Sequence, residues 1–115
     1  MTMTFLQAYD RARLFELFGN DPAAVAEVER EFLDTARAAE REIRETDDFT
    51  TIARAAHRLK GASGVIGAAA LHRIAEAVER AAQEEDLLTV LRLCETFGRA
   101  VRRVAKQAGL VAASP

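Results

Sequence analysis

The chain has 115 residues, of which 16 are lysine or arginine and 18 are aspartate or glutamate, for a formal net charge of −2 at pH 7. This length fits one domain, residues 1–115, with a single core, and the charge gives no general attraction to nucleic acid. Half of the residues are apolar but only 6% are aromatic, and prolines number two, a composition that suits long packed helices better than a β-sandwich.

Nothing in the sequence indicates export or a membrane span. The single cysteine, Cys94, cannot form an internal disulfide and lies in an apolar helical pattern, so we expect it in the core of a protein from a reducing compartment. No charged-then-apolar leader precedes Phe5, and no uninterrupted run of about 18 apolar residues occurs. We therefore expect a cytoplasmic protein that binds no membrane. We also expect a monomer.

The first two helices are predicted from apolar spacing and from the residues that end and begin helices. Apolar residues from Phe5 to Phe18 recur at helical intervals, with a break near Asp10, and Gly19-Asn20 favours a helix end. Asp21-Pro22 is an N-cap and first-turn pair, so a long helix is expected to begin there. Its expected inward residues are Val25, Val28, Phe32, Ala36, Ala39 and Ile43.

Three more helices follow. Thr46-Asp47-Asp48 predicts the cap of a third helix, which should end near Gly67. A fourth is expected from Ala68 to about Glu84, and Asp86 is expected to cap the last one. The last helix has apolar residues alternately three and four apart, which is typical of bundle packing. They are Leu87, Val90, Cys94, Phe97, Val101, Val104 and Ala108.

Four long amphipathic segments with short connections predict an all-α fold, an antiparallel up-down-up-down four-helix bundle, with the short N-terminal helix across one end. The tail after about residue 109 is expected to fray.

One stripe of the third predicted helix carries unusual chemistry. Residues three and four apart share a helix face, so this stripe holds His57, Lys60, Gly61 and Gly64. A glycine inside a helix costs about 1 kcal/mol relative to alanine, so two glycines beside a histidine need a reason beyond helix formation. We interpret them as room for a large partner to approach His57, with Lys60 supplying positive charge to an anion held there.

This segment resembles the histidine-containing phosphotransfer (Hpt) domains. Their motif, His-x-Leu-Lys-Gly-x-Ser-x-x-x-Gly-Ala, is met at His57, Leu59, Lys60, Gly61, Ser63, Gly67 and Ala68, and the likeness extends to Leu71, Ile74 and Glu79. The resemblance implies a protein of a two-component phosphorelay. Its His57 would accept a phosphoryl group from the phospho-aspartate of a response-regulator receiver domain and pass it to another.

Two side chains are expected to assist His57. For Nε2 to attack phosphorus, Nδ1 should carry the proton and donate it to an acceptor. A crossover near Ala68 places Glu79 level with His57, so Glu79 is the expected acceptor, with Glu76 as the alternative. Lys60 is expected to neutralise phosphoryl oxygens.

The remaining polar residues give weaker signals. Ser63 is expected to pack between helices, with its hydroxyl bonded to a backbone carbonyl one turn earlier. No strand with a Gly-rich phosphate loop is present, so we expect no ATP binding. No carboxylate cluster for Mg²⁺ is expected around His57, so we predict no metal site or cofactor in this chain and a partner that supplies Mg²⁺. The stripe formed by Arg99, Arg102, Arg103 and Lys106 is interpreted as a solvated face.

The partner is expected to dock beside His57 on an apolar patch with a basic rim. The expected docking residues are Ala53, Arg54, Arg58, Gly61, Gly64 and Val65. Two other functions stay open. One is the phosphoacceptor domain of a sensor histidine kinase of the chemotaxis type, with which a glutamate at position 79 is associated. The other is a helical adaptor without phosphotransfer, which the joint presence of His57 and Lys60 disfavours.

Overall fold

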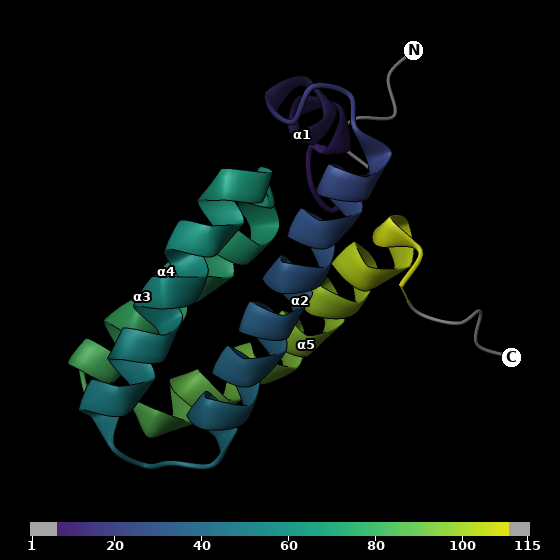
Figure 1. The fold of residues 1–115 in the computed structure, drawn as a ribbon. Helices are drawn as coiled ribbons and strands as arrows, with labels where there is room; N and C mark the ends of the chain where they lie inside the picture. The colour runs from purple at the N-terminus through teal and green to yellow at the C-terminus, as the bar shows by residue number, and fades with distance from the viewer. Residues whose placement is uncertain (1–6, 111–115) are drawn as a thin grey trace, which may run out of the picture.

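The computed structural model describes residues 7–110, which contain five α-helices and no strand (Figure 1). The helices are α1 (Arg11–Leu17), α2 (Pro22–Arg44), α3 (Phe49–Ile66), α4 (Ala69–Gln83) and α5 (Leu87–Ala108). The predicted all-α class is therefore confirmed. The Phe5 end of the predicted first helix, and the predicted frayed tail from residue 111 on, lie outside the described residues.

Four of these five helices begin at an aspartate whose carboxylate accepts a backbone N–H of the first turn. The caps are Asp10, Asp21, Asp48 and Asp86, with N···O distances of 3.0 to 3.2 Å. Such a cap satisfies a donor that the helix itself cannot, and it contributes about 1 kcal/mol. The caps predicted at the starts of α2, α3 and α5 are thus confirmed, whereas at the predicted break near Asp10 the structure begins a new helix.

Gly67 ends α3 and fixes the turn into α4. Its φ of 71° is left-handed, and a Cβ at this position would lie 2.8 Å from the Cβ of Asp10. Asp10 also donates its backbone N–H to the carbonyl of Ile66 at 3.2 Å. Gly67 is therefore required both by the turn and by the close approach of the N-terminal segment.

The core lies between the four long helices, since α2 and α4 each pack against both α3 and α5. The largest fully buried apolar side chains come from every helix, and they include Leu14, Leu33, Ile52, Leu71 and Phe97. Cys94 is buried, as predicted. Within the described residues, no helix combines the length and apolarity needed to cross a membrane.

Three expectations about the core need correction. Val28 is only half-buried, while Leu33, which was not predicted, is buried. Leu87, expected to face inward, is 37% exposed at the first position of α5. Ser63 is buried, but its hydroxyl has no hydrogen-bond partner among the described residues, so the predicted bond to a carbonyl is wrong. In a regular helix that carbonyl already accepts a backbone N–H, so the hydroxyl is not needed there.

A buried carboxylate, which the sequence did not predict, attaches the N-terminal segment to the bundle. Glu29 on α2 is 2% exposed, accepts the hydroxyl of Tyr9, and lies 2.8 Å from Arg11 Nε. Burial, together with the hydrogen bond to Glu29, raises the pKa of Tyr9, so the phenol stays protonated. Gln107 on α5 completes the attachment by accepting the N–H of Ala8 at 2.7 Å.

Candidate functional site

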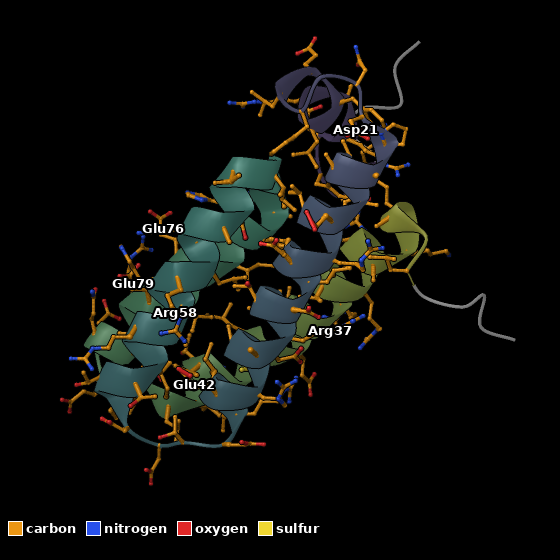
Figure 2. The ribbon with its side chains drawn as sticks, viewed as in Figure 1. Asp21, Arg37, Glu42, Arg58, Glu76 and Glu79 are labelled. Atoms are coloured by element: carbon orange, nitrogen blue, oxygen red, sulfur yellow. The ribbon has the colours of Figure 1, made fainter. Side chains whose placement is uncertain are left out.

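The predicted site lies where the outward stripe of α3 meets α4. The side chain of His57 is 67% exposed, whereas those of Lys60 and Glu79 are 26% and 16% exposed. Figure 2 shows Glu76 and Glu79 along the same side of the α3 and α4 pair. The histidine therefore projects into solvent above two more sheltered charged groups.

Glu79 contacts both of the other residues at once. One carboxylate oxygen, Oε2, lies 3.0 Å from His57 Nδ1, and the other, Oε1, lies 3.0 Å from Lys60 Nζ. The sequence predicted the contact with His57 but not the ion pair with Lys60. Since Lys60 follows His57 by one helical turn, a single carboxylate on α4 can join two residues of the same stripe on α3.

The ionisation of Glu79 decides which nitrogen of His57 carries the proton. Burial disfavours the charged carboxylate, but hydrogen bonds from Lys60 and His57 outweigh it, so the pKa of Glu79 lies below its ordinary value. Glu79 is therefore a carboxylate at neutral pH and can only accept hydrogen bonds. In neutral His57 the proton must then sit on Nδ1, and Nε2 keeps its free lone pair.

Glu76, the alternative acceptor, makes no ion pair within 4.0 Å in the part of the chain that the structure describes. It is exposed, one turn before Glu79 on α4. The geometry therefore brings Glu79, and not Glu76, to the imidazole.

Neither glycine of the stripe is needed for packing within the described residues. A Cβ added to Gly61 would meet nothing within 4 Å, and one added to Gly64 would meet only His72 Nδ1, at 3.9 Å. His72 itself donates from Nδ1 to the backbone carbonyl of Lys60 at 3.1 Å, a link between α4 and α3 that the sequence did not indicate. The surface beside His57 is thus open at both glycine positions.

The predicted docking residues do not lie together, and Gly64 lines a hollow of its own with His72. Ala53, Arg54 and Arg58 line an open hollow of about 570 Å³ beside His57 and Glu79. Val65 is 59% exposed but lines a separate hollow between α2 and α3. Arg58 is also held by Glu42 of α2 at 2.9 Å, and Figure 2 shows this pair. The expectation of one continuous patch from Ala53 to Val65 is therefore too simple.

Several residues of the hollow were not among the predicted docking residues. Its lining includes Phe49 at the start of α3 together with Ala82 and Gln83 at the end of α4. Phe49 lies four residues before Ala53, and Gln83 four after Glu79, so helical spacing from predicted residues would have found both. Phe49 and Ala82 give the hollow apolar surface, and the charged groups lie around it.

Metal-binding groups are lacking in the described part of the chain, where no three His, Cys, Asp or Glu side chains are placed to hold an ion. Near His57 the carboxylate of Glu79 is already engaged by a histidine and a lysine.

Comparison with known proteins gives one match. The family model of the Hpt domain matches residues 23–107, which include α3, α4 and nearly all of α2 and α5. No curated protein and no solved structure matches the chain significantly. Because the matched region covers most of the chain and contains the His57 stripe, the chain belongs to the Hpt domain family, whose members carry out histidine phosphotransfer in phosphorelays.

Proposed function

We propose that this chain is a phosphorelay intermediate in which His57 accepts a phosphoryl group from the phospho-aspartate of a receiver domain and passes it to a second receiver. The observation that carries the proposal is the contact of an exposed imidazole, through Nδ1, with an ionised Glu79. That contact leaves Nε2 as the nucleophile. It also puts a negative charge beside the ring that becomes positive during the reaction.

The transfer needs no proton donor or acceptor in solution. The lone pair of Nε2 attacks phosphorus in line with the leaving oxygen, an N–P bond forms, and the P–O bond to the aspartyl carboxyl breaks to release a carboxylate. The imidazole of His57 gains a positive charge and keeps its proton on Nδ1. That N–H donates to Glu79 Oε2, with an N···O distance of 3.0 Å. Return of the phosphoryl group to another aspartate reverses the same steps.

Lys60 is the cation best placed to meet the phosphoryl oxygens. Its ammonium group already lies within the site, 3.0 Å from Glu79 Oε1, on the same stripe as His57. The incoming oxygens and Glu79 would share this ammonium, which can donate three hydrogen bonds. We infer that Lys60 stabilises both the transition state and the phosphohistidine.

We infer that the partner supplies Mg²⁺ and docks beside His57. Glu79 is the carboxylate nearest His57 and is already paired with two groups, which disfavours a hard cation in this chain. A receiver domain would rest on the hollow beside His57, with Ala53 and Phe49 beneath it and Arg54 and Arg58 at its rim. Gly61 and Gly64 would leave its path clear.

The arrangement of the helices is inferred to be the antiparallel up-down-up-down bundle, in a cytoplasmic protein. The later residue of α3 contacts the earlier residue of α4: His57 contacts Glu79, whereas the carbonyl of Lys60 contacts His72. Such pairing favours opposite chain directions, with Glu79 about two turns beyond His72 and opposite His57.

The experiment is incubation of the chain with radiolabelled phospho-receivers from the same organism, with His57→Gln as the control. The proposal expects at least one receiver to label the wild-type chain and none to label the variant. A chain labelled only by an ATP-charged histidine kinase would instead be a kinase acceptor domain. A chain labelled by neither would be an adaptor.

A further inference from the structure

The outward face of α5 carries two groups of side chains that the His57 site does not use. Residues three and four apart share a helix face, and one such face of α5 is exposed throughout. It is formed by Leu88, Leu91, Arg92, Glu95, Arg99, Arg102, Arg103 and Lys106. We call its apolar end the leucine cluster, made of Leu87, Leu88 and Leu91. We call its other end the basic cluster, made of Arg99, Arg102, Arg103 and Lys106.

The leucine cluster is unusually exposed for its residue type. The exposed fractions of Leu87, Leu88 and Leu91 are 37%, 58% and 48%. A single exposed leucine is ordinary on a protein surface, but three neighbours on one helical turn form a continuous apolar area. Covering that area would remove apolar surface from water, at about 25 cal/mol per Å².

The basic cluster forms no ion pair within the described residues, although Arg102 reaches toward Glu40 of α2 beside Gly98. The sequence from Thr96 to Leu110 contains no aspartate or glutamate. None of the four cations lies within 4.0 Å of a carboxylate of the described residues, whereas four cations elsewhere do. Those paired cations are Arg11, Arg44, Arg58 and Lys60. Arg103 also shares the lining of one hollow with Arg73 of α4 and with Asp10, which is the one acidic residue there.

We propose that the outward face of α5 is a second docking surface, for a protein that presents apolar side chains to the leucine cluster and carboxylates to the basic cluster. The unpaired positive charge selects a negative partner, and opposite charges across an interface fix both orientation and encounter rate. The leucines require that the same partner be apolar at one end.

A protein fits this surface better than a nucleic acid or an anionic membrane. The turn before α5 holds Glu84, Glu85 and Asp86, directly beside the leucine cluster, and Glu95 separates the two clusters. A partner with uniform negative charge would meet these carboxylates and be repelled, and a nucleic acid would offer the leucines no apolar partner. A protein surface can place apolar, negative and positive groups separately.

The position of α5 makes this surface compatible with phosphotransfer. Helix α5 packs against α2 and α4, whereas His57 lies on α3 (Figure 1). A partner seated on the outward face of α5 would therefore leave His57 itself open to a receiver, although the leucine cluster begins two residues after Glu85, which lines the hollow beside His57. The inference depends neither on His57 nor on its chemistry, so the two can fail separately.

The test uses the full chain and a synthetic helical peptide with leucines in one half and glutamates in the other half of one face. Amide chemical shifts of the ¹⁵N-labelled chain should change along α5, from Leu87 to Lys106, and not around His57. Replacing the four cations of the basic cluster by glutamine should weaken binding at least about tenfold, and added salt should weaken binding to the wild type. Leu88→Gln should weaken it at any salt concentration.

A matched control removes arginines from an exposed face of α2 through Arg30→Gln, Arg37→Gln and Arg41→Gln, and it should change the affinity less than about twofold. All these positions are exposed, so circular dichroism should show intact helices in every variant. Unchanged binding by the α5 variants, or equal binding of a peptide with scrambled order, overturns the proposal. So does preferential binding of duplex DNA or phosphatidylserine vesicles. Self-association that Leu88→Gln abolishes also overturns it, because a second copy would then cover the face.

Discussion

Substitution of Gly61 by glutamine separates docking from folding. A Cβ at Gly61 meets nothing within 4 Å, so the longer side chain fits without strain in the isolated chain. Removing a glycine from a helix interior stabilises by at most about 1 kcal/mol, which corresponds to a rise of about 4 °C in Tm for a domain of this size. Thermal unfolding followed by circular dichroism measures that gain.

The same side chain should obstruct the receiver. The aspartyl phosphate must come within about 3 Å of the imidazole, and a displacement of about 1 Å can cost about 100-fold in rate. We therefore expect transfer from a phospho-receiver to Gly61→Gln to fall by about 100-fold. Phosphoramidate is small and needs no docking surface, so its reaction with His57 should change much less.

Gly61→Ala is the matched control, since it stabilises the helix at least as much as glutamine does, but with a single methyl group, and should retain most of the transfer. Transfer at the wild-type rate in Gly61→Gln would refute the reasoning, and so would a fall in Tm. Either result would show that Gly61 does not serve to keep the surface beside His57 open for a receiver.

Three further predictions concern His57, Glu79 and Gly67. His57→Gln should abolish labelling with helicity and Tm nearly unchanged, and the wild-type label should be labile in acid and stable in base; label that moved to His72 would contradict the assignment. Glu79→Gln should slow phosphorylation and change the ¹⁵N chemical shifts of the His57 ring, which report its tautomer, and an unaltered rate with unaltered shifts would remove Glu79 from the mechanism. Because folding lowers the pKa of Glu79, its charge stabilises the fold above its ordinary value of 4.5, and that contribution is lost as the pH falls through the lowered value. The difference in stability between wild type and Glu79→Gln, measured by urea unfolding, should therefore shrink in acid. Gly67→Ala should destabilise by about 1–3 kcal/mol, since φ is 71° and the new Cβ would press on Asp10; an unchanged urea midpoint would show that the turn adapts.

Local signals explain why so much of the fold could be predicted from the sequence. The carboxylates of Asp21, Asp48 and Asp86 accept N–H groups two or three residues away, so a few adjacent residues determine where a helix starts. Gly67 likewise ends α3 by its own backbone conformation. The placement of Glu79 beside His57 followed from equal distances to the turn, which holds for any antiparallel helix pair.

Contacts between distant segments could not be predicted in this way. Glu29 occurs in a run of charged residues, and only the approach of Tyr9 and Arg11 makes it a buried acceptor. The ion pair of Lys60 with Glu79 depends on rotamers across two helices. Val65 was placed with Ala53 from one helix alone, but Val65 lines a hollow that α3 shares with α2, whereas Ala53 lines one that α3 shares with α4.

The position of the phosphoryl group on the ring tests the central claim most directly. The chain, with ¹⁵N-labelled histidine, is incubated with a phospho-receiver and Mg²⁺, and the phosphorylated nitrogen is assigned by ³¹P and ¹⁵N NMR in base. Since Glu79 holds Nδ1, we predict a single N–P bond at Nε2 of His57, formed more slowly in Glu79→Gln. A phosphoryl group on Nδ1 or on another residue would contradict this claim. So would the absence of any phosphorylation after incubation with every receiver of the organism.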